Sequence, residues 1–221
     1  MFLNFGSCAI CTIGGTKFYQ EFTESGTVTL EPMPYKFTLV GGGSGSIGAA
    51  VAPLTESGRA CIVQGSVGGV LVCAITLFVR TTLTLTIGDG GAASGFQATG
   101  TGTGNAGGAT KIVGLQGDLI AGGGTAPSVR VFRGNFTPTP GAQGTNNYFA
   151  GANVIENNKQ TITSSSHQGY IHQETYPAQL LLNTNFAKDP TRGAAGCNGW
   201  LNTGSLQTMP GEKGIIVIES M

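Results

Sequence analysis

Two stretches of the chain alternate apolar and polar residues with a period of two, which is the pattern of a strand with one buried face. In residues 35–40, tyrosine, phenylalanine and leucine alternate with lysine and threonine. In residues 82–87, threonine alternates without exception with leucine or isoleucine. We therefore predict two half-buried strands, and we expect the threonine face of the second to lie toward solvent.

Two other runs are apolar on both faces, as expected for central strands or for strands covered by a neighbouring chain. They are Val70 to Val79 and the run from Gly214 to Ile218. The second run must pair with the earlier sheet, so we predict that it closes one β unit. Shorter strands are predicted at 17–22, 27–30, 59–64, 111–113, 118–121 and 129–133.

Three of the predicted strands end abruptly in glycines, at Gly41–Gly43, at Gly88–Gly91 and at Gly122–Gly124. Glycine loses more backbone freedom on folding than any other residue, so 38 glycines beside β-branched runs require a reason. Tight turns or close approach of main chains would supply one. Helical periodicity is lacking throughout. The fold class predicted is all-β, a glycine-rich β-sandwich-like domain with long glycine and threonine loops.

The pattern divides the chain into four parts. Residues 1–16 form an N-terminal segment, and 17–133 form the glycine-rich β domain. Residues 134–209 are a polar and aromatic excursion with the composition of loops, and 210–221 supply the strand that completes the β domain. The glycine phrases recur at unequal spacing, which argues against a solenoid of fixed period.

Charged residues make up only 10% of the chain, and their formal charges cancel. A surface with so few charges predicts that part of it is covered by copies of the same chain or by a partner. The scattered basic residues give no footprint for nucleic acid. The N-terminus shows no signal-peptide pattern, and no run reaches the length of a membrane span. Synthesis in a cytoplasm is therefore expected.

Motifs of enzymes are weak or incomplete. Residues 43–48 match G-x-G-x-x-G, but Pro53 would stop the helix that a dinucleotide fold needs, and no acidic residue follows near Gln64. Cys8 and Cys11 have the spacing of a metal or redox pair without a second pair nearby. No G-x-S-x-G elbow occurs. We expect no catalytic residues, no cofactor and no metal.

Of the remaining cysteines, Cys61 and Cys73 lie inside predicted strands and are interpreted as small core residues. The fifth is Cys197. An odd number in a chain of this length does not indicate a disulfide framework.

The excursion concentrates aromatic side chains and both histidines of the chain among turn-forming residues. Aromatic rings give a large contact area at small entropic cost, so this segment is interpreted as a contact surface. The alternative is that the same rings fill a second small core. The candidate contact residues are Tyr148, Phe149, His167, Tyr170, His172, Tyr176 and Trp200.

The order of these features resembles a known family. The phrases are SGTVTLEPMPYKFTLVGGGSGS, TTLTLTIGDGGAASG, GNAGGATKIVG, LIAGGGT and, after the excursion, PGEKGIIVIES. Together, over residues 22–126 and 210–219, they resemble the glycine-rich domain of bacteriophage tail-fibre and tail-tip adhesins and of related virion or bacterial surface proteins. The glycine runs here are shorter than those that pack as polyglycine II layers in such adhesins. A conventional β-sandwich is therefore favoured, with some polyglycine II packing as the alternative.

The resemblance implies a non-enzymatic protein of the virion surface that attaches to a bacterial receptor, either a cell-surface glycan or an outer-membrane protein. It also implies other virion fibre proteins as partners, and it places receptor contacts in the loops at 92–106 and 134–205. The second hypothesis is a purely structural subunit of a capsid, fibre or extracellular filament that associates with itself. An enzyme remains the third and most distant option.

Overall fold

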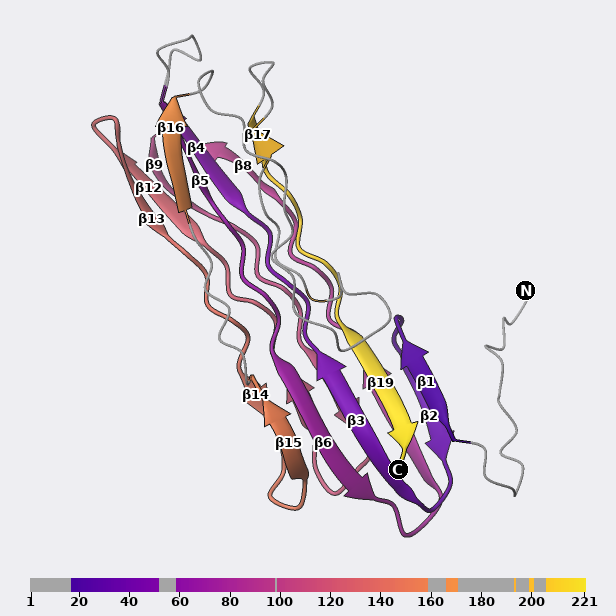
Figure 1. Ribbon diagram of the computed structural model, residues 1–221. Coiled ribbons are helices and arrows are strands. Elements are labelled where there is room, and N and C mark those ends of the chain that lie inside the picture. The colour runs from indigo at the N-terminus through magenta and orange to yellow at the C-terminus, as the bar shows by residue number, and fades with distance from the viewer. Residues whose placement is uncertain are drawn as a thin grey trace, which may run out of the picture.

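The computed structural model describes residues 17–51, 59–97, 99–158, 166–170, 193, 199–200 and 206–221. It shows a long, narrow molecule with a sheet-rich unit at each end and wavy, extended chain segments between them (Figure 1). We call these units the lower and upper sandwich, after their places in Figure 1. All regular elements of the described residues are strands, so the all-β prediction is correct.

The lower sandwich contains two sheets of five strands. Sheet I has the order β1-β19-β3-β6-β15, and sheet II has the order β14-β11-β10-β7-β2. The strands of sheet I are β1 (Tyr19–Phe22), β3 (Pro34–Val40), β6 (Val70–Thr76), β15 (Asn153–Asn157) and β19 (Ile215–Ser220). Those of sheet II are β2 (Gly26–Leu30), β7 (Thr81–Thr86), β10 (Thr110–Val113), β11 (Leu119–Ala121) and β14 (Asn146–Asn147).

Alternation along the strands builds the core of the lower sandwich. Phe37 and Leu39 of β3 and Leu83 and Leu85 of β7 point into one cluster between the two sheets, as the period of two predicts. The threonines of β7 lie on the other face and are exposed. The three central strands of sheet I bury their second face as well, in a cluster of Val40, Val70, Val72, Ile215 and Val217.

The upper sandwich is smaller. Sheet III has the order β16-β5-β4-β8, and sheet IV has the order β13-β12-β9. The strands of sheet III are β4 (Ile47–Val51), β5 (Arg59–Val63), β8 (Ser94–Gln97) and β16 (Ser166–Tyr170). Those of sheet IV are β9 (Gly100–Thr103), β12 (Ser128–Phe132) and β13 (Asn135–Thr139). Ile47, Val63, Val129 and Val131 are among its buried core residues. A separate pair joins β17 (Gly199–Trp200) and β18 (Leu206–Gln207).

Seven segments of the described chain cross between the two sandwiches without strand assignment, and we call them the glycine bundle. They are residues 41–46, 64–69, 87–93, 104–109, 122–127, 140–145 and 208–214. Each of the first six continues directly from a strand of one sandwich into a strand of the other, and the last runs from β18 into β19. The bundle therefore both connects the two sandwiches and separates them.

Hydrogen bonds within the bundle follow a period of three. The N–H groups of Gly41 and Ser44 donate to one neighbour, at Gly69 and Ser66. Those of Gly42 and Gly45 donate to a second, at Gly108 and Asn105, and those of Gly43 and Ser46 to a third, at Glu212 and Met209. A period of three is that of a polyproline-II-type chain, which has no internal hydrogen bonds. The backbone of an isolated chain of this type is hydrogen-bonded to water, whereas here it is hydrogen-bonded to the neighbouring segments. The middle of the molecule thus differs from a conventional sandwich.

Segment 41–46 lies at the centre of a closed ring. Around the ring, each segment is hydrogen-bonded to the next, in the order 64–69, 122–127, 104–109, 87–93 and 208–214. Gly193 completes the circle, because it donates to Lys213 and accepts from Gly68. Segment 140–145 lies outside this ring, bonded to Thr125 and Val67. The central segment is consequently enclosed by main chain on every side.

Close approach explains the glycines of the bundle. A β-carbon built on Gly68 would lie within 3.0 Å of the carbonyl oxygen of Gly41, and one on Gly107 would meet that of Gly42 in the same way. Positive φ is not the reason, because the described glycines with positive φ are Gly100, Gly114, Gly134 and Gly193. Glycine is needed here because backbone lies where a side chain would be.

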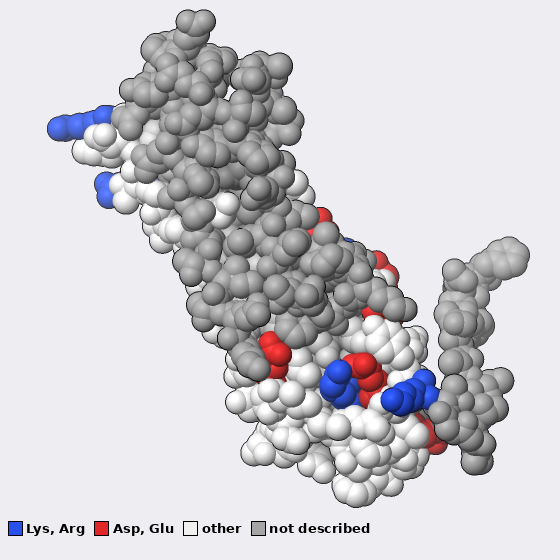
Figure 2. Space-filling view, viewed as in Figure 1, with Lys and Arg blue, Asp and Glu red and all other residues white. Residues whose placement is uncertain are grey.

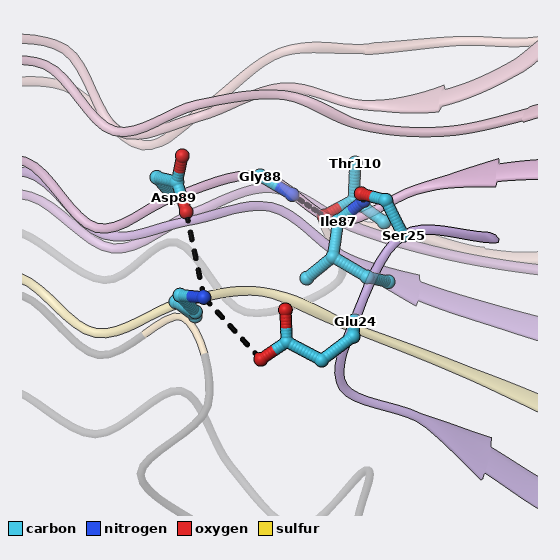
Figure 3. A network of polar contacts seen from close by, with 7 residues as sticks. Glu24, Ser25, Ile87, Gly88, Asp89 and Thr110 are labelled. Atoms are coloured by element: carbon cyan, nitrogen blue, oxygen red, sulfur yellow. Dashed lines mark hydrogen bonds and ion pairs between the residues drawn. The ribbon is translucent and has the colours of Figure 1, made fainter. Parts of the chain in front are cut away.

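Side chains attach the bundle to the lower sandwich (Figure 3). The Thr110 hydroxyl is buried, donates to the Val40 carbonyl at 2.7 Å and accepts from the Gly88 N–H at 3.0 Å. On the surface nearby, Lys213 Nζ lies 3.4 Å from Glu24 Oε1 and 3.7 Å from Asp89 Oδ1. Where the strands stop, the buried hydroxyl gives the backbone groups of Val40 and Gly88 the hydrogen-bond partners that a neighbouring strand would otherwise supply. The exposed ion pairs contribute little to the stability of the fold.

The boundaries differ from the sequence prediction at several places. β6 ends at Thr76, so the predicted strand 70–79 is too long by three residues. After the G-x-G-x-x-G match the chain forms β4 and not the helix that a dinucleotide site requires. Strands β13, β14 and β15 lie within the 134–209 excursion and pair with β12, β11 and β6 of the framework. β19 lies between β1 and β3, as its apolar run predicts.

Candidate contact surfaces

The candidate aromatic residues lie at opposite ends of the molecule. Tyr148 and Phe149 follow β14 in the lower sandwich, whereas β16 carries His167 and Tyr170 in the upper sandwich (Figure 1). Trp200 belongs to β17 and pairs with Leu206. The structure therefore does not bring these five residues together on one surface. His172 and Tyr176 lie outside the described residues.

Of the two candidate aromatic residues in the lower sandwich, one packs against the core. Phe149 is partly buried against the lower core and against Gly117, where an added β-carbon would lie 2.6 Å from the β-carbon of Phe149. Tyr148 is 40% exposed. Phe149 thus adds to the core of the lower sandwich and not to a separate second core, whereas Tyr148 lies at the surface.

The end of the lower sandwich exposes apolar side chains that the sequence analysis assigned to a strand. Phe78 and Val79 lie in the turn between β6 and β7, where they are 82% and 68% exposed. Together with Phe149 and Met221 they line a wide depression of about 1010 Å³. Exposed apolar residues grouped in this way are typical of a surface that contacts another protein. The run 70–79 contains no glycine, proline, asparagine or aspartate, so its sequence does not indicate that the strand ends at Thr76 and that a turn follows.

The upper sandwich exposes an aromatic ring beside two cations. Phe132 is 57% exposed at the end of β12. The guanidinium carbons of Arg130 and Arg133 lie 5.7 Å and 5.1 Å from the centre of its ring, within the range of cation–π attraction. Arg133 and Gly134 form the two-residue hairpin turn to β13, with φ values of 49° and 76°. Both positive values are those of a type I′ turn.

Sheet IV extends this group into a largely polar face. Val129 and Val131 point into the core, so Arg130 and Phe132 point outward. Arg130 lies between Thr101 of β9 and Thr137 of β13. We call the exposed outer side of sheet IV the Arg–Phe face. Its residues are Thr101, Thr103, Ser128, Arg130, Phe132, Arg133, Asn135, Thr137 and Thr139.

Charge is distributed unevenly along the molecule. In the view of Figure 2, acidic side chains of the described residues lie in the middle and lower parts, whereas basic side chains lie both beside them in the lower part and protruding at the upper end. The ion pairs of the described residues involve Lys36, Arg80 and Lys213 with acidic partners. Arg130 and Arg133 take part in none of these pairs. The Arg–Phe face was not predicted from the sequence, although Arg130 and Phe132 lie two residues apart on the same side of the predicted strand 129–133.

The described residues give no sign of metal or thiol chemistry. They contain no group of three or more histidine, cysteine or acidic residues that could hold a metal ion. Burial raises the pKa of Cys61 to about 11 and that of Cys73 to about 12, so both thiols are protonated at neutral pH. Both are core residues, as predicted. Within the same residues, no helix has the length and apolar character needed to cross a membrane.

Comparison with known proteins does not identify a family. No protein-family model matches the chain, and no curated protein matches its sequence.

Proposed function

We propose that this protein is a non-enzymatic component of a virion surface, in a tail fibre or tail tip, that attaches to a receptor on a bacterium. The observation that carries the proposal is the glycine bundle, which separates two sandwiches and turns a chain of 221 residues into a long, narrow support. The order of glycine phrases along the chain, which resembles that of phage adhesins, points in the same direction.

Rigidity is what such a support contributes to binding. In the bundle, N–H groups at consecutive positions of segment 41–46 are bonded to three different neighbours, so the segment cannot bend toward one side without losing bonds on another. Side chains held on a rigid support lose less conformational freedom when they bind. The upper sandwich presents an exposed aromatic ring, guanidinium groups and threonine hydroxyls in this way.

The receptor of the proposal is a host cell-surface glycan or an outer-membrane protein. The protein is made in the host cytoplasm and acts on the virion surface, beside other fibre proteins and other copies of its own chain. An extracellular or cell-surface location on a bacterium is the alternative. Neither nucleic acid nor a cofactor has a role in this proposal.

Attachment of the purified protein to host cells tests the proposal directly. We expect fluorescently labelled protein to bind the cells saturably and to block attachment of the virus particles. Replacement of Tyr170 and Trp200 by alanine in the upper part should weaken binding, whereas Tyr19→Ala in β1 of the lower sandwich, an exposed tyrosine outside the candidate set, serves as a matched control. A folded protein that neither binds the cells nor competes with particles would contradict the proposal. Release of reducing sugar ends from host polysaccharide would instead reveal an enzyme.

A purely structural subunit is the second candidate, and the exposed apolar end of the lower sandwich favours it. Phe78, Val79 and Met221 are all more than two-thirds exposed. Contact with another subunit would remove this surface from water. Sedimentation of the protein and of a Phe78→Ser, Val79→Ser variant tests this function. Loss of assembly in the variant, together with no attachment of the parent to cells, would favour the structural subunit over the adhesin.

A further inference from the structure

We propose that the Arg–Phe face of sheet IV binds an acidic glycan of the host surface, with Phe132 stacked on a sugar ring and Arg130 and Arg133 bound to its carboxylate groups. This inference rests on the proposed function and names the class of receptor. It concerns residues that lie apart from the seven aromatic and histidine candidates of the sequence analysis.

The two arginines are placed for an external anion. Both are exposed, and neither has an ion-pair partner among the described residues. The Arg–Phe face has no acidic residue of its own. Guanidinium presents a planar fork of donors that matches the two oxygens of a carboxylate, and stacking on the Phe132 ring restricts its orientation. Charge complementarity therefore selects an anionic partner.

The conformation of Arg133 supports a role for this side chain. Its φ of 49° is in the left-handed region, which asparagine, aspartate and glycine occupy far more readily than arginine. The hairpin thus holds an arginine where another residue would fit the turn better. Non-glycine residues in this region often lie at functional positions, where the side chain compensates for the strain of the backbone. Here the side chain places a second cation on the ring of Phe132.

The rest of the face suits a saccharide. Cross-strand pairing puts Thr101 and Thr137 on either side of Arg130, and Thr103 and Thr139 on either side of Ser128. These rows present hydroxyl groups, which both donate and accept hydrogen bonds, as sugar hydroxyls require. Phe132 supplies an apolar face for a pyranose ring at the edge of the rows. An exposed face with one ring, two cations and several hydroxyls matches an acidic glycan chain lying across the strands.

A nucleic acid fits the face less well. Specific and non-specific complexes with nucleic acids neutralise several phosphates at once, often six to ten. Among the residues of the upper sandwich whose side chains the structure describes, the exposed cations are Arg130 and Arg133. Two guanidinium groups with uncharged hydroxyl rows instead suit a polymer whose charges are separated by neutral sugar hydroxyls.

Calorimetric titration of the whole protein with oligogalacturonate measures the interaction, and the methyl ester of the same oligosaccharide removes the charge while keeping the sugar rings. We expect the free acid to bind at least 10-fold more tightly than the ester. An increase in NaCl from 50 to 500 mM should weaken binding several-fold, because salt screens exposed charges. Equal affinities for acid and ester would overturn the proposal.

Variants then locate the binding. Arg130→Gln together with Arg133→Gln should reduce the affinity for oligogalacturonate at least 10-fold, and Phe132→Leu should reduce it about 3- to 10-fold. Lys111→Gln is the matched control, because Lys111 is an exposed cation beside Thr86 on sheet II, without a stacked ring. An equal loss with Lys111→Gln, or tighter binding of a single-stranded oligonucleotide of the same charge, would overturn the assignment. The substituted side chains are exposed, so unchanged thermal unfolding is expected and checks the fold of each variant.

Binding to cells separates this inference from the proposed function. If parent protein attaches to host cells and the Arg130→Gln, Arg133→Gln variant attaches equally well, the Arg–Phe face is not the receptor surface and the inference fails alone. If the parent binds oligogalacturonate through these residues but not host cells, the glycan surface is supported and the adhesin function fails.

Discussion

The carbonyl oxygen of Gly42 occupies the place that a β-carbon on Gly107 would need. The two residues belong to antiparallel neighbours of the glycine bundle, and the same neighbours are joined by the bond from the Gly42 N–H to the Gly108 carbonyl. Because segment 41–46 is enclosed by a ring of main chain, Gly42 cannot move away from an added β-carbon without displacing the segments on its other side. The backbones of neighbouring segments can therefore lie this close together only because glycine has no side chain.

Gly107→Ala should destabilise the protein by about 3 kcal/mol or more, at the upper end of the range for overpacked cores. The matched control is Gly26→Ala at the start of β2, where a β-carbon would meet nothing within 4 Å. That change should be neutral or stabilise by about 0.5 kcal/mol, because alanine loses less backbone entropy on folding. Denaturant unfolding measures both. Similar effects at the two sites would contradict the close-packing explanation.

Thr110→Val should cost about 3 kcal/mol. The substitution keeps the shape of the side chain but removes the hydroxyl that serves the Val40 carbonyl and the Gly88 N–H, and each buried group left unsatisfied costs about 1–3 kcal/mol. Faster amide exchange at Gly88 should accompany the loss. Thr84→Val on the exposed threonine face of β7 is the control, with an expected change within about 0.5 kcal/mol. A cost for Thr110→Val no larger than that of the control would show that the junction does not depend on this hydroxyl.

Alkaline pH should destabilise the protein through its two buried thiols. The pKa of each thiol is raised by burial, so the unfolded chain loses these protons from about pH 9.0 while the folded chain keeps them until about pH 11 for Cys61 and pH 12 for Cys73. The folded state therefore binds more protons in this window, and its free energy of unfolding falls as pH rises. Each thiol contributes a loss of about 2 kcal/mol at pH 10.5.

Unfolding of the parent and of a Cys61→Ala, Cys73→Ala variant at pH 8 and pH 10.5 isolates this effect. The variant should be less stable at pH 8, because it loses buried volume, but its stability should depend less on pH. Equal pH dependence of the two proteins would contradict the prediction.

Arg133→Asn should separate stability from binding. Asparagine relieves the left-handed strain of the hairpin, worth about 1 kcal/mol, against an exposed cation–π contact worth about 0.5 kcal/mol. The free energy of unfolding should therefore equal or exceed that of the parent, while affinity for oligogalacturonate falls. A variant that binds as tightly as the parent would show that the turn arginine has no part in recognition.

The sequence was sufficient to predict strands whose apolar residues face a core. Each predicted run from 17–22 to 214–218 overlaps a strand of the structure, although Phe78 and Val79 fall in a turn. In the two sandwiches, the strands without a prediction are mostly edges, namely β8, β9, β13, β14, β15 and β16, and the exception is β4. An edge strand pairs on one side only, so polar residues, and even Pro138 in β13, are compatible with it. Such strands carry little hydrophobic signal.

The glycine bundle could not be predicted in detail for a different reason. Which carbonyl lies opposite Gly68 or Gly107 depends on segments far away in the chain, and glycine carries no side chain that could specify a partner. The candidate surfaces show the same limit. The aromatic residues of 134–209 were easy to recognise, but their division between two ends of the molecule follows from pairing with β5, β6 and β11.

The ring around segment 41–46 also constrains how this protein reaches its native state. The enclosed segment is made early by the ribosome, yet it needs partners from residues 105–108, 122–127 and 209–212. A nascent chain must therefore carry its glycine stretches without their final neighbours until the residues near 214 have emerged. Contacts of such long sequence separation form slowly, and unpaired backbone is prone to aggregate meanwhile. Efficient production of the protein should accordingly depend on chaperones or on slow growth at low temperature.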